Sequence, residues 1–255
     1  AWGRLLSGST RPQKTGYADV LEFTGIDTRY YDHPRLKKFY RWLFGSVVTP
    51  TKNLHAFGDF LPFTRYPLEE GEKERLRNAA LAYRGGRFDP RAGRYAAWAL
   101  DDRSPPGHIL SYVPKRNRYD PEVPSSTLYA DGGAFFREPI DSPDALGAML
   151  YNITKRAGSH AHQETNALSL SAYGGRLLVN SGWLGTALKP ARRNNTLTVN
   201  GLEHKRRTGA GLVEGFTSDG LDFATGHSGE ALPGKARFER SLFLVHSQDG
   251  ANGYF

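Results

Sequence analysis

Two histidines stand two residues apart in the sequence, at His160 and His162, directly before the polar run Gln-Glu-Thr-Asn at 163–166. On a strand, an i, i+2 spacing directs both imidazoles to the same face. Imidazole is the commonest metal ligand in proteins and the side chain that titrates nearest to neutral pH. The pair therefore predicts a metal site or an acid–base site, while two ordinary histidines at the entry of a strand are the alternative interpretation.

A second polar cluster consists of two arginines followed by two asparagines, at Arg192, Arg193, Asn194 and Asn195. Guanidinium groups bind carboxylate and sulfate oxygens through paired hydrogen bonds, so the cluster is a candidate site for an anionic group. A solvated loop before a strand explains the same residues equally well. By composition alone, the isolated Tyr17 is interpreted as a packing residue.

Several catalytic signatures are absent from the sequence. It contains no GxxxxGK[ST] phosphate loop, no GxGxxG between a strand and a helix, no GxSxG elbow and no HExxH. These absences argue against the nucleotide-binding, hydrolase and metalloprotease classes that carry such motifs. The lack of cysteine excludes a disulfide framework, a thiolate zinc site and a cysteine nucleophile.

The charge of the chain favours a polyanionic partner. Its 255 residues include 34 Lys and Arg against 26 Asp and Glu, a formal net charge of +8. The positive residues are spread along the chain and do not alternate with stacking aromatics, so we do not expect nucleic acid to be that partner. The longest apolar runs, such as 242–245, are far shorter than the ~20 residues of a spanning helix, and we expect no membrane insertion.

The elements that must position these residues change in character along the chain. Apolar spacing predicts two helices within 17–49, the second capped by Asp32, and further helices over 69–83 and about 93–101. Five prolines between 103 and 126 indicate a linker. Beyond it, alternating runs predict antiparallel strands over 127–137, 167–173, 176–179, 196–199, 221–225 and 237–245. Helices followed by strands indicate an α+β protein.

Four segments resemble, in order and spacing, the heparinase II/III-like polysaccharide lyases, a group that includes alginate lyases. The segments are YADGGAFFR at 129–137, SHAHQETN at 159–166, AYGGRLLVNSG at 172–182 and RNNTLTVNG at 193–201. The resemblance implies the C-terminal part of an (α/α) toroid with a linker over 1–118, followed by an antiparallel β-sandwich over 119–255. Since neither end has the character of a natural terminus, we expect the chain to be truncated at both ends.

The resemblance also implies an activity, the cleavage of a uronate-containing anionic polysaccharide by β-elimination. Tyr17 matches the tyrosine that serves as general acid or as both acid and base, and His160 matches the active-site histidine. Substrate binding is assigned to Arg192, Arg193, Asn195 and Trp183. A uronate C5 epimerase on the same scaffold and a non-catalytic carbohydrate-binding protein are the alternatives.

A divalent metal ion is the expected cofactor, with His162, Asn180 and Asn194 as its ligands by the same resemblance. The sequence departs from the family pattern here, because Asn180 replaces an acidic ligand and Asn194 replaces a histidine. Amide ligands shift the preference from zinc toward calcium or manganese, or toward no ion. The polymeric substrate implies a secreted or periplasmic protein, while the sequence leaves the oligomeric state open.

Overall fold

The computed structural model describes residues 24–26, 32–58, 86, 89–99, 119–155, 161–180, 189–248 and 252–255. The chain divides into two compact units, and each is described by itself. The first, here called the helical unit, comprises residues 1–48 and 67–124; the second, the sheet unit, comprises residues 49–66 and 125–255. The expected boundary at 118/119 stays a prediction.

The helical unit contains the α-helices α3 (Pro34–Trp42) and α5 (Pro90–Ala99) and the π-helical turn η1 (Leu43–Val47). Leu36 and Tyr40 form the buried stripe of α3, and Tyr40 stacks on Phe44 of the turn that continues it. Gly45 permits the close approach of α5, because a Cβ there would lie 2.8 Å from the ring of Tyr95. No helix in the described ranges is long and apolar enough to cross a membrane.

The cap of α3 corrects one sequence expectation. His33, and not Asp32, is the N-cap residue, and its Nδ1 accepts a hydrogen bond from Arg35 N at 3.2 Å. Pro34 occupies the first turn, where a missing N–H costs nothing. Across the unit, Arg41 and Asp89 form an ion pair, with 3.0 Å between Nη2 and Oδ1. Burial raises the pKa of Asp89, but the hydrogen bond and positive charge of Arg41, together with main-chain hydrogen bonds, outweigh it and hold that pKa below its usual range.

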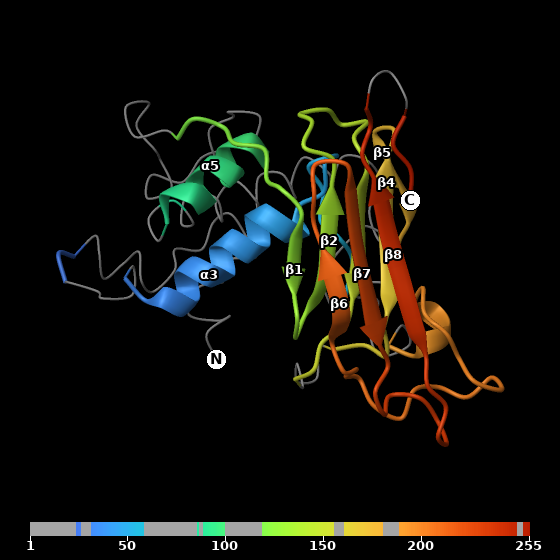
Figure 1. Ribbon diagram of the computed structural model, residues 1–255. Coiled ribbons are helices and arrows are strands. Elements are labelled where there is room, and N and C mark those ends of the chain that lie inside the picture. The colour runs from blue at the N-terminus through green and yellow to red at the C-terminus, as the bar shows by residue number, and fades with distance from the viewer. Residues whose placement is uncertain are drawn as a thin grey trace, which may run out of the picture. The chain divides into compact units, whose positions relative to one another are not determined.

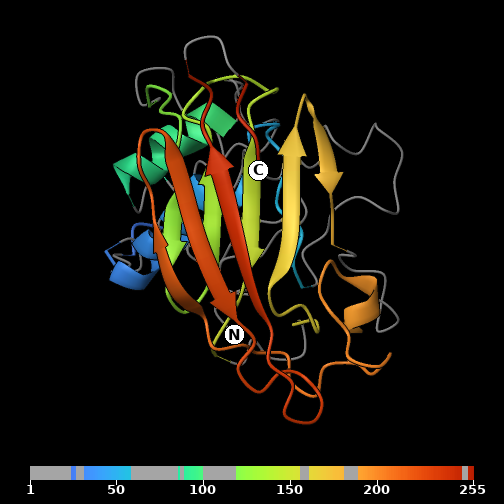
Figure 2. The same cartoon turned by 45° about the vertical axis from the view of Figure 1, so that its right-hand side comes forward.

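The sheet unit consists of two antiparallel sheets. The first has the strand order β1-β2-β3-β4-β5 and the second the order β6-β7-β8. Their bounds are β1 Thr127–Tyr129, β2 Gly133–Arg137, β3 Gly147–Tyr151, β4 Ala167–Ala172, β5 Gly175–Leu178, β6 Leu212–Phe216, β7 Leu221–His227 and β8 Glu239–Val245. Figures 1 and 2 show β6, β7 and β8 lying over the larger sheet. Helices together with two antiparallel sheets confirm the α+β class.

The two sheets pack face to face on one apolar core. Alternate residues of β2, β3 and β4 meet alternate residues of β7 and β8 there. The buried members are Ala134, Phe136, Leu146, Ala148, Leu150, Ala172, Ala224, Leu242 and Leu244. The sheet unit is therefore a β-sandwich.

Residues 49–58, here called the strap, cover the outer face of the larger sheet. Pro50 lies against Gly147 so closely that a Cβ on that glycine would come within 2.5 Å of the proline Cδ. Farther along, His55 Nδ1 lies 3.1 Å from Ser169 Oγ, and Phe57 stacks on Tyr151 at 4.8 Å between ring centroids. Both faces of the central strand β3 are thus covered within the sheet unit.

The strands differ from the sequence expectations at four places. The expected strand over 127–137 is a hairpin, β1 and β2, with a turn at 130–132. The run 196–199 is not a strand, because only an isolated bridge between Val199 and Leu202 forms there. Strands β3 and β6 were not predicted. The expected helix over 69–83 lies outside the described residues.

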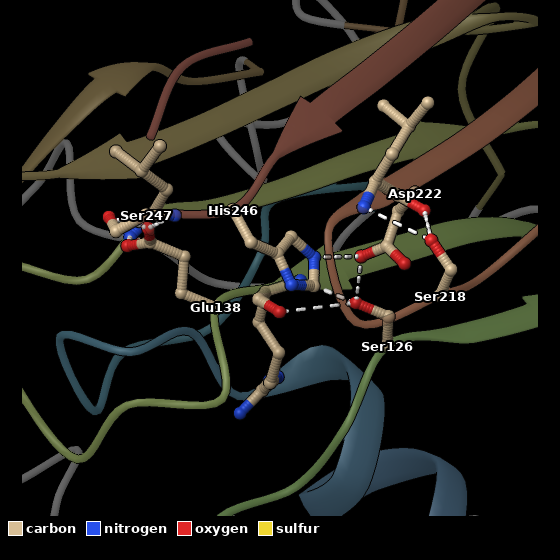
Figure 3. A network of polar contacts seen from close by, with 9 residues as sticks. Ser126, Glu138, Ser218, Asp222, His246 and Ser247 are labelled. Carbon is tan, nitrogen blue, oxygen red and sulfur yellow. Dashed lines mark hydrogen bonds and ion pairs between the residues drawn. The ribbon is translucent and has the colours of Figure 1, made fainter. Parts of the chain in front are cut away.

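A buried polar network closes one end of the sandwich, where β7 begins and β8 ends (Figure 3). His246 Nε2 lies 2.8 Å from Asp222 Oδ2, and Ser126 Oγ lies 2.5 Å from the same oxygen. Beside this pair, the Glu138 carboxylate accepts hydrogen bonds from Leu146 N and Ser247 N. Burial raises the pKa of Glu138, but the hydrogen bonds outweigh it and hold that pKa below its usual range.

Replacing Asp222 with alanine is expected to lower the free energy of unfolding by about 3 kcal/mol, because the buried His246 and the half-buried Ser126 lose their common acceptor. Urea unfolding followed by circular dichroism measures the change. Ser218→Ala is the control, since that hydroxyl hydrogen-bonds only the main chain of Leu221 in an exposed turn and its loss should cost no more than ~1 kcal/mol. Equal losses in the two variants would contradict the structural role of the network.

Candidate functional site

Strands of both sheets bring the described members of the predicted site, His162, Asn180 and residues 192–195, to one end of the sandwich, here called the motif end. There β3 ends at Tyr151, β4 begins at Ala167 and β5 ends at Leu178. In the other sheet β7 ends and β8 begins at this end, which lies at the bottom of the sandwich in Figures 1 and 2. Residues 161–166 of the histidine motif therefore lie on a turn between β3 and β4, at the end of the sandwich opposite the network of Figure 3.

Asn166, the last residue of the histidine motif, joins the two sheets. Its Nδ2 donates to Gly226 O and Phe238 O at 3.0 and 3.1 Å, and its Oδ1 accepts from Asn152 Nδ2 at 2.6 Å. Asn152 Nδ2 also donates to His227 O at 2.9 Å. Asn166 has a left-handed backbone with φ 56°, a conformation that asparagine tolerates better than most residues. The asparagine of the motif is thus a structural residue.

Glu164 fixes the motif turn to the strap. Its Oε1 accepts a hydrogen bond from Gly58 N at 2.6 Å, and its own carbonyl accepts from Ala167 N at 2.9 Å to close the turn. The adjacent Tyr151 is buried, and burial together with the negative charge of Glu164 raises the pKa of its phenol. Tyr151 therefore stays protonated near neutral pH and is unsuited to act as a base.

Asn180 connects three segments through its amide. Its Nδ2 donates to Ala56 O of the strap at 3.0 Å, and its Oδ1 accepts from Asn195 N at 2.8 Å. Asn195 Nδ2 in turn donates to Leu168 O of β4 at 3.1 Å. The end of β5, the strap and the arginine–asparagine loop are thereby held together, and two of the predicted site residues, Asn180 and Asn195, are in direct contact.

The three expected metal ligands lie on segments that hydrogen-bond to one another. His162 is completely buried, and the next residue, Gln163, donates its N–H to Lys189 O at 2.8 Å in the chain leading to Asn194. The amides of Asn180 and Asn194 are engaged with main-chain groups, Asn194 Nδ2 with Pro190 O at 3.0 Å. Within the described ranges, no three His, Cys, Asp or Glu side chains are placed to hold a metal ion. The metal stays a prediction.

The two arginines of the loop differ in their surroundings. Both lie in the 3-10 turn η6 (Ala191–Arg193) and are exposed. Arg192 forms an ion pair with Glu203, whereas Arg193 has no acidic partner among the residues described. Arg193 is therefore the more available of the two for an anionic ligand. Arg240, which the sequence did not single out, donates to Asn166 O and Asn195 O at 2.8 and 2.7 Å and braces this loop from β8.

Three predicted site residues, Tyr17, His160 and Trp183, lie outside the described residues. Their roles stay predictions. The described structure does show that the segment following His160 is fixed from several sides, by the strap, by β8 and by the arginine–asparagine loop.

His55 of the strap is a buried titratable group that the sequence reasoning missed. It stands in the apolar run Leu54 to Phe57 and has no partner nearby in sequence, so no local pattern marks it. Burial, followed by the positive charges of Arg137 and Arg176, lowers its pKa to about 3. The imidazole is consequently neutral near pH 7 and holds Ser169 by a hydrogen bond.

Comparisons with known proteins show the fold of the chain. No protein-family model matches it, and no curated protein matches it. A crystal structure of heparinase III aligns with a TM-score of 0.64 and 12% identity over 88% of this chain and 34% of that chain. A second heparinase III structure gives 0.60 and 16%, over 90% and 33%. A mutant of heparan sulfate lyase HepC from Pedobacter heparinus gives 0.57 and 15%, over 78% and 29%.

These structures confirm, at the level of the fold, the resemblance to heparinase II/III-like lyases that the sequence indicated. The chain spans about a third of the length of each of them. At this identity, the alignment concerns the scaffold and does not transfer residue roles.

Replacing Asn166 with aspartate is expected to lower the free energy of unfolding by about 3 kcal/mol, since a buried carboxylate would face two carbonyl oxygens in place of two N–H donors. Asn200→Asp is the matched control, because Asn200 has a similar left-handed backbone, φ 51°, but is exposed. Urea titration of both variants provides the measurement. An Asn166→Asp variant as stable as the wild type would show that the amide does not join the sheets.

The low pKa of His55 predicts an acid-sensitive fold. The unfolded chain binds a proton at this residue near pH 6.5 and the folded chain only near 3, so stability falls as the pH is lowered through that window. The expected slope from this residue is about 1.4 kcal/mol per pH unit. His55→Asn should flatten the decline measured by urea unfolding between pH 7 and 4, and unchanged slopes would disprove the assignment.

Proposed function

We propose that the protein is a polysaccharide lyase that cleaves a uronate-containing anionic polysaccharide, a glycosaminoglycan or alginate, by β-elimination. The observation that carries the proposal is the meeting, on a heparinase-like scaffold, of the segment after His160 with the arginine–asparagine loop. Main-chain bonds such as Gln163 N to Lys189 O and Leu168 N to Asn195 O join the two segments. In the same proposal, the helical unit is the end of an (α/α) toroid, and the polymeric substrate places the protein outside the cytoplasm.

The proposed reaction removes the proton at C5 of the uronate and breaks the bond between C4 and its oxygen O4. The electron pair of the C5–H bond forms the C4–C5 double bond, and the departing O4 takes up a proton. Because a carbon acid of this kind is weak, the negative charge that develops on the carboxylate must be stabilised by positioned donors. His160 is assigned to that neutralisation or to proton transfer, and Tyr17 to the transfer itself.

Anion binding is assigned to exposed cations at the motif end. The exposed guanidinium of Arg193 can bind a carboxylate or sulfate group in paired hydrogen bonds. Asn195 supports this loop through its bonds to Asn180 and Leu168, so its contribution to substrate binding is to hold Arg193 in place. Trp183 completes the set of proposed substrate contacts.

Tyr17→Phe and His160→Ala are each expected to lower kcat by at least ~100-fold while the fold is kept, the scale for loss of a general acid–base group. Elimination creates a C4–C5 unsaturated uronate that absorbs ultraviolet light more strongly than the substrate, so a spectrophotometric assay over a panel of uronans measures the effect. Tyr173→Phe, at an exposed hairpin tyrosine, is the control and should keep wild-type activity.

Three results would contradict this proposal in different ways. Near wild-type activity of either variant would remove that residue from the mechanism. Exchange of the C5 proton with solvent without an absorbing product would identify an epimerase. Binding without either reaction would identify a carbohydrate-binding protein.

A further inference from the structure

Beyond Arg192 and Arg193, basic side chains gather on two further loops at the motif end, residues 203–210 and 228–237. Together with the two arginines, they form a group that we call the basic loop surface. All of its basic members are exposed: Arg192, Arg193, Lys205, Arg206, Arg207, Lys235 and Arg237. The loops follow η6 along the chain and lie at the same end of the sandwich in Figures 1 and 2.

Hydrogen bonds hold the two loops together. Lys205 N donates to Ala231 O at 2.9 Å, and Lys205 Nζ donates to Gly234 O at 3.3 Å, beside Lys235. His204 is buried, and its ring nitrogen Nε2 lies 2.7 Å from Leu197 O. The basic side chains therefore stand on an anchored support, which reduces the entropy lost when a ligand binds.

The same loops are attached to the proposed active site. Gln163, directly after His162, donates its side-chain amide to His204 O, and Glu203 pairs with Arg192. A polymer bound with its reacting sugar next to the histidine motif would therefore extend onto the basic loop surface.

Acidic residues do not neutralise this surface. It contains only Glu203 and Glu230, and each already pairs with an arginine, Arg192 and Arg206 respectively. The other five basic side chains have no acidic partner among the described residues. Because screening reaches about 8 Å in physiological salt, neighbouring charges on these loops act together on a polyanion.

We infer that the basic loop surface binds the part of the anionic polysaccharide that extends beyond the reacting sugars, through carboxylate or sulfate groups. The inference rests on the proposed function. Three of the five unpaired cations, Arg193, Arg207 and Arg237, are arginines, and the planar fork of a guanidinium fits such groups. The loops contain no Phe, Tyr or Trp on which nucleic-acid bases would stack, which favours a polysaccharide over a single-stranded nucleic acid.

The double variant Arg207→Glu/Arg237→Glu tests the inference. With long heparan sulfate chains, KM or the dissociation constant should rise at least ~10-fold and its salt dependence should weaken, because fewer counterions are released. The value of kcat should stay within about twofold, and a heparan sulfate tetrasaccharide, which offers fewer anionic groups beyond the reacting sugars, should be affected much less. Repeating the assay with desulfated chains shows whether sulfate or carboxylate groups make the contact.

Two matched variants separate charge from structure. Arg207→Lys/Arg237→Lys retains the positive charge and should keep most of the affinity. Arg35→Glu/Lys38→Glu makes the same charge change on exposed residues of α3, in the other unit, and should leave the affinity for heparan sulfate close to wild type.

The outcomes distinguish this inference from the proposed function. If the wild-type protein yields no unsaturated product from any uronan, the lyase proposal fails, while a loss of heparan sulfate binding in the double variant still supports the surface. Unchanged binding in the folded double variant would overturn the inference. Preferential binding of duplex DNA of equal charge by the wild type would overturn it as well.

Discussion

The amide pair Asn152–Asn166 is the interaction on which the motif end depends. The two sheets share an apolar core. At this end, main-chain carbonyl groups lie between the sheets and need hydrogen-bond partners in place of water. Asn166 satisfies two carbonyls of the smaller sheet, and Asn152 bridges from its partner to His227 O and Gly211 N. Since Asn166 also ends the histidine motif, the packing of the sheets sets the position of that turn.

Two further supports of the site are neutral side chains. Asn180 connects the strap to the arginine–asparagine loop through an amide, and His55, kept neutral by its low pKa, holds the strap to β4 through Ser169. Neutral groups of this kind can be buried at a modest cost when their hydrogen bonds are made, whereas isolated charges cannot. Asn180 and His55 therefore support the site without carrying a charge, whereas Glu164 and Arg240 support the motif turn as charged groups.

Much of the sandwich could be predicted from alternation of apolar and polar residues. Strands β4, β7 and β8 show that pattern because one face of each meets the core. Strand β3 shows none, since the strap buries its outer face and all five of its residues are buried. Apolar and polar residues also alternate in the run 196–199, but this run forms no strand. Thr196 Oγ1 hydrogen-bonds Thr165 O, and Leu197 O hydrogen-bonds the ring of His204. The motif marks the candidate site in the sequence, whereas the segments that support it carry no such mark. The strap lies more than 100 residues away from the motif in sequence and carries no local signal.

The departure of Asn180 and Asn194 from the family pattern acquires a physical meaning in this arrangement. A carboxylate at 180 would repel the carbonyl of Ala56 that the Asn180 amide now bonds, and it would need a cation or a donor in that place. The amide instead offers one donor and one acceptor, which match a carbonyl on one side and an N–H on the other. The asparagine can therefore hold three segments together without a cation as their common partner. Positive charge at this end is then supplied by arginine and lysine side chains on the surface, where water reaches them and where a charged polymer can replace that water.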